Sequence, residues 1–214
     1  MAPESDPDAT RLQVPLAYEE GLWSRGFSRV AGVDEVGRGP LAGPVVAAAV
    51  VLPPGCRIPG ARDSKQLSGI RRETLSREIL KEARSVGLGA ASVREIEELN
   101  IAGATALAVS RALSALDPPP DHVVIDGRPM RRLEWSHEAV VGGDSRVHSI
   151  ACASIVAKVC RDRLMRRLAA RYPSYGWETN VGYGTAQHME ALRQFGPSPH
   201  HRRTFGGVQL DLEL

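Results

Sequence analysis

Three short apolar segments of the chain each end in acidic residues: Val33-Asp34-Glu35, Ile125-Asp126-Gly127 and Gly143-Asp144-Ser145. Apolar strands carry their last residues to the edge of a sheet, which is where open α/β folds bind ligands. Carboxylates that converge there repel one another, so they either hold a proton or bind a cation. No His or Cys cluster stands beside them, and an all-oxygen site favours Mg²⁺ or Mn²⁺ over Zn²⁺. The alternative is that each acid caps a turn, which is common for one Asp-Gly pair but less so for three.

A glycine-rich loop, Gly37-Arg38-Gly39, follows the first acidic pair. It lacks both the GxGxxG spacing and a following Lys-Ser/Thr pair, so neither nucleotide-binding fingerprint fits. Its glycines leave a bare backbone that a ligand can approach closely. Arg38 offers a planar donor for a phosphate group. The alternative, a tight turn between two strands, is compatible with this function.

Charge is unevenly spread along the chain, although the formal net charge of the 214 residues is only +2. Residues 128–171 hold ten Lys or Arg against four Asp or Glu, whereas residues 73–121 hold five against eight. A basic segment suits a polyanionic partner such as nucleic acid, although many such segments are only solvated helix faces. The basic cluster His200–Arg203 predicts a solvated tail, and the alternative is that it contacts a phosphate. Serines near His148 lack a GxSxG elbow, so we expect His148 to be a partly exposed structural residue.

The elements that must position these residues alternate between strands and helices. Wholly or largely apolar runs predict strands over residues 29–34, 44–52, 86–93 and 122–126, with a similar pattern over 140–144. Apolar residues at helical spacing predict helices over residues 68–84, 93–100, 102–116, 149–171 and 185–195. This order indicates an α/β domain built on one central sheet.

The length suits a single domain, which we place at residues 18–206, between a flexible leader (1–17) and a flexible tail (207–214). The longest run without charge, residues 39–56, is too short and too rich in Pro and Gly to span a membrane. No secretory signal is visible at the N-terminus. Three cysteines without CxxC spacing predict a reducing, cytoplasmic setting and no structural zinc.

Motifs along most of the chain resemble those of ribonuclease HII, the bacterial type 2 ribonuclease H. They stand in the family's order over about residues 18–206: VAGVDEVGRGPLAGPVV (30–46), DSKQLS (63–68), NIAGAT (100–105), IDG (125–127), GDSR (143–146), ASIVAKVCRD (153–162), GYGT (182–185) and HRRTF (201–205). The resemblance implies a ribonuclease H-like mixed central sheet flanked by helices, with a C-terminal helical segment beside the substrate groove. It also implies cleavage of RNA hybridised to DNA, including cleavage 5′ to single ribonucleotides in duplex DNA, which leaves 3′-hydroxyl and 5′-phosphate ends.

Carried over motif by motif, the resemblance assigns two divalent ions, Mn²⁺ or Mg²⁺, to four acids. Asp34 would bridge both ions, Glu35 and Asp126 would complete the site near the leaving group, and Asp144 would hold the ion that activates water. Together with Tyr183, the backbone of Gly37, Arg38 and Gly39 would contact the 2′-hydroxyl. This hydroxyl is the group that distinguishes RNA from DNA. The candidates for phosphate contact, or else solvated surface, are Lys65, Arg146 and Lys158. Asp162 lies in a matching motif but is expected to pair with a neighbouring base.

The last six residues, 209–214 (QLDLEL), are similar to short peptides that dock on the bacterial sliding clamp. Spaced leucines could fill an apolar groove on that partner through Gln209, Leu210, Leu212 and Leu214. A final strand or a free end is an equally good interpretation, because short motifs recur by chance. We expect a monomer that binds RNA–DNA hybrids and ribonucleotide-containing duplexes and no membrane. The other functions we considered are a DNA-strand resolvase of the same fold and a catalytically silent hybrid-binding module.

Overall fold

A five-stranded mixed sheet forms the centre of the molecule, and its strand order is β3-β2-β1-β4-β5. The computed structural model describes residues 14–208. The strands are β1 (Val30–Val36), β2 (Val45–Val51), β3 (Ser85–Ala91), β4 (His122–Asp126) and β5 (Glu138–Val140). β1, β2 and β3 pair antiparallel, whereas β1, β4 and β5 pair parallel. The predicted α/β fold with a mixed central sheet flanked by helices is confirmed.

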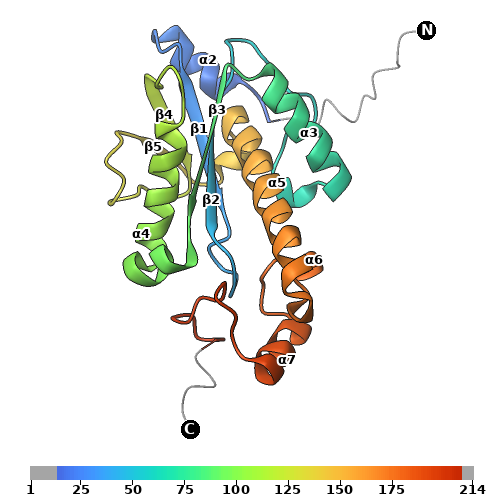
Figure 1. Ribbon diagram of the computed structural model, residues 1–214. Helices are drawn as coiled ribbons and strands as arrows, with labels where there is room; N and C mark the ends of the chain where they lie inside the picture. Colours follow the sequence, from blue (N-terminus) through green and yellow to red (C-terminus); the bar gives the residue numbers. More distant parts are fainter. Residues whose placement is uncertain (1–13, 209–214) are drawn as a thin grey trace, which may run out of the picture.

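Helices cover both faces of the sheet, which explains why β2 is apolar along its whole length (Figure 1). Ala47 and Ala49 of β2 pack in the cluster formed with α4 (Val93–Ser114). Ala48 and Val50 point the other way, toward α3 (Gly69–Glu82) and α5 (His148–Arg171). Successive side chains of a strand face opposite sides, so a strand buried on both faces has no polar position.

Close packing of α5 on the sheet depends on a glycine in β1. A Cβ atom added at Gly32 would lie 2.3 Å from the carbonyl carbon of Ser149, at the start of α5. The same turn of α5 is held by α2 (Ala17–Ser24), because Oε1 of the buried Glu19 accepts hydrogen bonds from the backbone N–H (2.7 Å) and the hydroxyl (2.8 Å) of Ser149. The α5 N-terminus is therefore fixed against β1, immediately beside the acids that β1 carries.

The helix α4 contains a break at Asn100, where φ is +59°. Asn100 Oδ1 accepts hydrogen bonds from the N–H groups of Ala102 (3.0 Å) and Gly103 (3.2 Å), so it caps the second half of the helix. The first half begins with a capping box made by Ser92 and Glu95. The prediction of two helices over 93–100 and 102–116 is confirmed, since the two meet at this residue.

The C-terminal part of the chain forms a helical module at the far end of α5 (Figure 1). It contains η3 (Pro173–Tyr175), α6 (Trp177–Asn180) and α7 (Ala186–Phe195). Backbone hydrogen bonds dock it on the loop after β1: Leu41 N–H donates to the Gly182 carbonyl (2.8 Å), and Arg202 N–H to the Leu41 carbonyl (2.8 Å). The glycine-rich loop and the module are thus one packed unit.

Several boundaries differ from those expected. Val14 and Leu16, in the predicted leader, are buried, and so is Val208, in the predicted tail. The division into leader, domain and tail stays a prediction. β5 ends at Val140, and the expectation of a strand reaching Asp144 is wrong. His148 is buried rather than partly exposed, because its ring nitrogens contact the Ile58 N–H (3.0 Å) and the Val14 carbonyl (3.1 Å).

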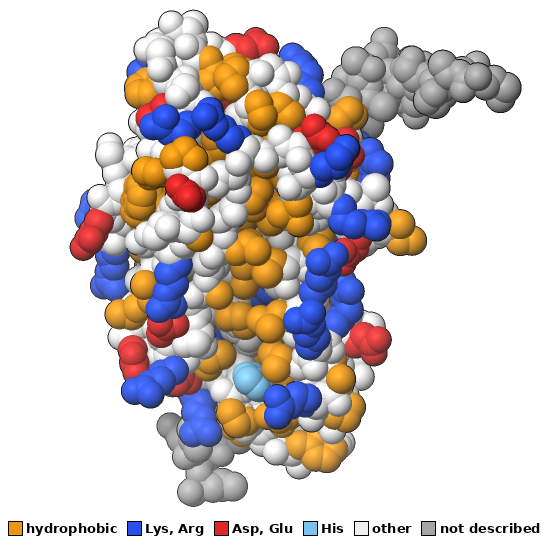
Figure 2. All heavy atoms as spheres, turned by 45° about the horizontal axis from the view of Figure 1, so that its top comes forward, with side chains coloured by type: hydrophobic (Ala, Val, Ile, Leu, Met, Phe, Trp, Pro, Cys, Tyr) orange, Lys and Arg blue, Asp and Glu red, His pale blue; other side chains and the backbone are white. Residues whose placement is uncertain are grey.

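One face of the molecule carries a band of hydrophobic side chains bordered by Lys and Arg (Figure 2). A groove of about 450 Å³ lies between α3, β3 and α5, with exposed Leu80 and Leu88 in its lining and Arg163 and Arg167 at its side. In the part of the chain that the structure describes, no helix is both long and apolar enough to cross a membrane.

Candidate active site

The acids of β1 and β4 leave the sheet side by side. These two strands are parallel neighbours, with Val33 paired to Ile125, so that Asp34 and Asp126 follow at the same end of the sheet. Glu35 is the next residue of β1. The site follows from strand pairing alone, because parallel strands end at the same edge.

Among the four acids, Asp34 has the most strongly perturbed pKa. Burial and then the charge of Glu35 raise the pKa of Asp34 to about 8, and the charge of Asp126 adds to this effect. The Ser154 hydroxyl and the Glu35 N–H, 2.7 Å from Asp34 Oδ1, act in the opposite direction. The full set of carboxylates therefore cannot ionise at neutral pH without a compensating cation.

Glu35 is tied to the glycine-rich loop. Burial raises the pKa of Glu35, and Arg38, whose Nη1 lies 3.1 Å from Glu35 Oε1, lowers it. The charge of Asp126 raises it again. Glu35 and Asp126 also line a hollow of about 660 Å³ together with Arg38 and residues of α4 and of the segment 127–132. The hollow opens directly onto the carboxylates.

Asp144 reaches the site from a short 3-10 helix, η2 (Gly143–Ser145), rather than from the end of a strand. Asp126 Oδ1 accepts a hydrogen bond from the Gly143 N–H (2.7 Å), which holds η2 against the end of β4. Burial, then the charge of Asp63, then that of Asp126 raise the pKa of Asp144, and Lys65 lowers it. The structure therefore brings all four predicted acids to one region.

Asp63 is a neighbour of the site that the sequence reasoning missed. It precedes the short helix η1 (Ser64–Gln66), where its Oδ1 accepts a hydrogen bond from the Lys65 N–H at 3.0 Å. The sequence feature that could have identified Asp63 is its position at the start of the DSKQLS segment, two residues before Lys65. Its effect on the pKa of Asp144 adds one more acid to the edge of the cluster.

The donor set fits a hard divalent cation. Every donor is a carboxylate oxygen, the preferred ligand of Mg²⁺ and Mn²⁺, and the acids raise one another's pKa. Within residues 14–208, no three Asp, Glu, His or Cys side chains are arranged to hold an ion as they stand. The carboxylates thus form an open cluster, which has to draw together around a cation.

The glycine-rich loop lies beside Tyr183. Arg38 and Gly39 are exposed, and a Cβ atom built on Gly39 would lie 3.7 Å from Cε1 of Tyr183. The Tyr183 side chain is 47% exposed, so its ring is open to a ligand. The loop therefore lies against the ring and, through Arg38, pairs with one of the four acids.

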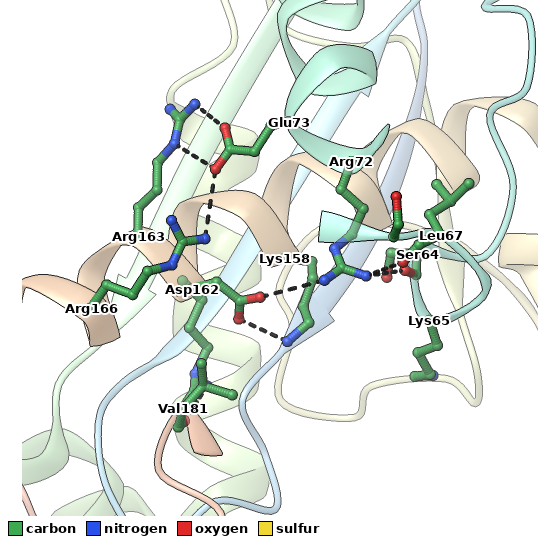
Figure 3. A network of polar contacts seen from close by, with 12 residues as sticks. Ser64, Lys65, Leu67, Arg72, Glu73, Lys158, Asp162, Arg163, Arg166 and Val181 are labelled. Carbon is green, nitrogen blue, oxygen red and sulfur yellow. Dashed lines mark hydrogen bonds and ion pairs between the residues drawn. The ribbon is translucent and has the colours of Figure 1, made fainter. Parts of the chain in front are cut away.

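The three predicted phosphate contacts differ in their surroundings. Lys65 and Arg146 are exposed near Asp144, where they are accessible to a ligand. Lys158 is instead engaged, because its Nζ lies 2.7 Å from Asp162 Oδ1 (Figure 3). The expectation that Asp162 pairs with a neighbouring base is confirmed.

The Asp162 network also supports the loop that carries Lys65. Arg72 lies 4.0 Å from Asp162 and donates hydrogen bonds to the carbonyls of Ser64 and Leu67, on either side of Lys65 (Figure 3). The backbone from which Lys65 projects is therefore fixed by α3 and α5.

The prediction of a solvated tail at His200–Arg203 is wrong for its two central residues. His201 and Arg202 are 1% and 0% exposed. His201 Nε2 lies 2.9 Å from Nε2 of His188, and Arg202 donates to carbonyls of the glycine-rich loop. A histidine beside an arginine is equally common on a solvated surface, so the sequence alone does not show that this pair is buried. His201 and Arg202 are buried because this part of the chain packs against the glycine-rich loop.

A mixed sheet with clustered carboxylates at the ends of adjacent parallel strands, beside an exposed glycine-rich loop, defines a metal-dependent phosphodiester hydrolase of the ribonuclease H-like fold. The sequence model of "Ribonuclease HII" matches residues 31–208. A curated ribonuclease HII of Thermosynechococcus vestitus is 55% identical over 192 residues, 89% of each chain. The chain belongs to the ribonuclease HII family.

Solved structures agree with this assignment. The crystal structure of the ribonuclease H2 from Pyrococcus horikoshii is similar, with a TM-score of 0.72 and 29% identity over 85% of this chain and 95% of that one. The ribonuclease HII in a PCNA complex from Archaeoglobus fulgidus has a TM-score of 0.70 and 25% identity over 83% and 95%. The predicted family and enzyme class are confirmed.

Proposed function

We propose that the chain is an endoribonuclease that hydrolyses the RNA strand of RNA–DNA hybrids and cuts 5′ to single ribonucleotides in duplex DNA. The products are 3′-hydroxyl and 5′-phosphate ends. The observation that carries the proposal is that Asp34, Glu35 and Asp126 at one end of the sheet lie close to Asp144 of η2, next to an exposed loop and aromatic ring. Such a site serves ribonucleotide removal during DNA replication and repair in the cytoplasm, and the three free cysteines suit that compartment.

The four acids would hold two divalent ions, Mg²⁺ or Mn²⁺. When bound, such ions supply a hydroxide nucleophile near neutral pH and neutralise the departing oxygen. The chain's own carboxylates provide the charge and the oxygen donors that attract the ions. Arg38 pairs with Glu35, and the Gly143 N–H donates to Asp126, so these contacts keep both carboxylates close to the site before an ion binds.

Selection for RNA rests on the glycine-rich loop and Tyr183. The backbone of Gly37, Arg38 and Gly39 can approach a sugar closely enough to contact its 2′-hydroxyl. The exposed ring of Tyr183 offers a face for the next deoxyribose, where a further 2′-hydroxyl would clash. Lys65 and Arg146 are available for the phosphates on either side.

The test is cleavage of a duplex that carries one ribonucleotide, with and without Mg²⁺ or Mn²⁺, with the position of the cut mapped. We expect a metal-dependent cut on the 5′ side of the ribonucleotide, and no cut in the matched all-DNA duplex. Cleavage of the all-DNA duplex would favour the resolvase alternative. Binding without any cleavage would favour a silent hybrid-binding module, and an Asp126→Asn variant with full activity would overturn the site assignment.

We further propose that the C-terminal tail binds a sliding clamp. Gln209, Leu210, Leu212 and Leu214 lie outside the described residues, so the support comes from their sequence pattern and from the similar ribonuclease HII solved in complex with PCNA. The chain without residues 209–214 should lose binding to the clamp of its own organism while it keeps cleavage of a short duplex. Unchanged clamp binding would exclude this role.

A further inference from the structure

Two arginines are completely buried beneath the glycine-rich loop. Arg161 of α5 and Arg202 are both 0% exposed, and their hydrogen-bond acceptors are backbone carbonyls. Within residues 14–208, neither guanidinium lies within ion-pair distance of a carboxylate. Burying a charge without an opposite charge is costly, even when its hydrogen bonds are satisfied. Two such charges behind one loop therefore call for a functional explanation.

Arg202 orients two successive peptide groups of the loop. Its Nη2 donates to the carbonyl of Gly37 and its Nη1 to that of Arg38, at 2.9 Å. In a trans peptide the N–H points opposite to the C=O, so the N–H groups of Arg38 and Gly39 face away from Arg202. Both residues are exposed, and neither N–H has an acceptor within residues 14–208. Successive backbone N–H groups that point out of a turn can bind an anion.

Arg161 joins the loop to the turn that carries Tyr183. It donates at 3.0 Å to the carbonyls of Ala42 and Pro44, and also to that of Val181. Val181 has a φ of +43°, which is unfavourable for a β-branched residue and needs support from its surroundings. A Cβ atom at Gly37 would lie 2.1 Å from Arg161 Nε, so the loop requires glycine where the guanidinium passes beneath it.

We propose that Arg161 and Arg202 are positioning residues that aim the Arg38 and Gly39 N–H groups at a phosphate oxygen beside the ribonucleotide and place two positive charges behind it. The inference rests on the proposed function, because it names the part of the substrate that the loop binds. Their carbonyl contacts set the direction of the amides, and their charge favours an anion over a neutral group. Arg161 also holds the turn that carries Tyr183 beside the loop, through its hydrogen bonds to the carbonyls of Val181 and Ala42.

The first test compares Arg202→Lys and Arg161→Lys with the matched control Arg163→Lys. Lysine keeps the charge but cannot span two or three carbonyls as a planar guanidinium does. Arg163 lies on α5, is exposed and pairs with Glu73. On a duplex with one ribonucleotide, we expect Arg202→Lys to raise KM about tenfold with little change in kcat, as for a lost charge-assisted contact. We expect Arg161→Lys to raise KM likewise, and Arg163→Lys to behave as the wild-type chain does.

A substrate with a neutral methylphosphonate at the phosphate beside the ribonucleotide separates binding from mere structural support. The wild-type chain should lose about tenfold in kcat/KM on this substrate, whereas Arg202→Lys should lose little more than it has already lost. Fully multiplying losses, or an Arg202→Lys variant that loses kcat on every substrate alike, would overturn the proposal.

Amide NMR of the wild-type chain keeps the inference testable if the variants do not fold. Titration with inorganic phosphate should shift the Arg38 and Gly39 resonances, whereas Gly55, another glycine with positive φ in a loop, should not move. Equal or absent shifts would contradict the proposal. This readout does not need catalysis, so a chain that binds phosphate here but cleaves no duplex would refute the proposed function and not this inference.

Discussion

At the scale of single residues, the site consists of acids that lie close enough to raise one another's pKa. Asp34 is the clearest case, because burial and the neighbouring charges raise its pKa to about 8. In the unfolded chain an aspartate ionises near pH 4. Between these two values the unfolded state binds fewer protons than the folded state, so this residue makes the metal-free protein less stable as the pH rises.

We therefore predict that Asp34→Asn stabilises the metal-free protein at pH 8, by about 1–3 kcal/mol, while it abolishes cleavage. The measurement is urea unfolding in the presence of a chelator at pH 5 and pH 8, with the gain expected mainly at pH 8. The matched control is Asp162→Asn, which loses the ion pairs with Lys158 and Arg72 and should destabilise the protein. A destabilised Asp34→Asn variant at pH 8 would contradict the repulsion between the acids.

Tyr183 supplies a second prediction at this scale. A Cβ atom built on Gly39 would lie 3.7 Å from Cε1 of the Tyr183 ring, so the ring lies directly beside the glycine-rich loop. We expect Tyr183→Phe to reduce cleavage at a single ribonucleotide about fivefold, the effect of one lost hydrogen bond or polar contact. Cleavage within a continuous RNA tract should fall less, because it depends less on recognition of the following deoxyribose. Equal losses on both substrates would count against this role.

At the scale of elements, most of the scaffold was predictable. The strands containing Asp34 and Asp126 follow from apolar runs of strand length, and the register of parallel neighbours then places both acids together. The position of Asp144 was harder, because Gly142 turns the chain after β5 and the acid stands on η2. The local sequence pattern could not predict this position of Asp144, because the hydrogen bond from the Gly143 N–H to Asp126 is a tertiary contact.

The break in α4 gives a prediction about an element. Asn100 adopts a left-handed φ and caps the second half of the helix, whose residues Ala102 and Thr105 line the hollow beside the acids. Asn100→Ala should cost about 1–3 kcal/mol of unfolding free energy, because it loses the cap and strains the backbone. Asn100→Gly should cost less than Asn100→Ala, since glycine adopts this conformation without strain. Thermal unfolding of the three proteins checks the order, and the reverse order would refute the capping role.

At the scale of the whole molecule, the C-terminal module docks on the loop after β1 and brings Tyr183 beside the glycine-rich loop. Its buried centre is a chain of neutral groups: His201 Nδ1 accepts from the Ser198 N–H (2.9 Å), and the His188 ring contacts both His201 and the Tyr183 carbonyl (2.8 Å). Composition could not predict this centre, because the same histidines and arginines would equally suit a solvated end. Only the packing of residues far apart in sequence buries them.

Protonation of this centre should loosen the module. Burial and the neighbouring His188 lower the pKa of His201 to about 4, whereas an unfolded histidine titrates near 6.5. The stability that His201 contributes is therefore complete above about pH 6.5 and is lost as the pH falls toward 4. We expect His201→Gln to flatten this part of the stability profile, measured by urea unfolding from pH 7 to pH 4. An unchanged slope in His201→Gln would contradict the argument.

Anomalous diffraction from crystals of the wild-type chain with Mn²⁺ and a duplex carrying one ribonucleotide shows whether the four acids draw together around divalent ions. We predict two Mn²⁺ peaks, ligated by Asp34, Glu35, Asp126 and Asp144, beside the phosphate to be cut. Peaks elsewhere, or a bound duplex with no Mn²⁺ on these carboxylates, would contradict the account.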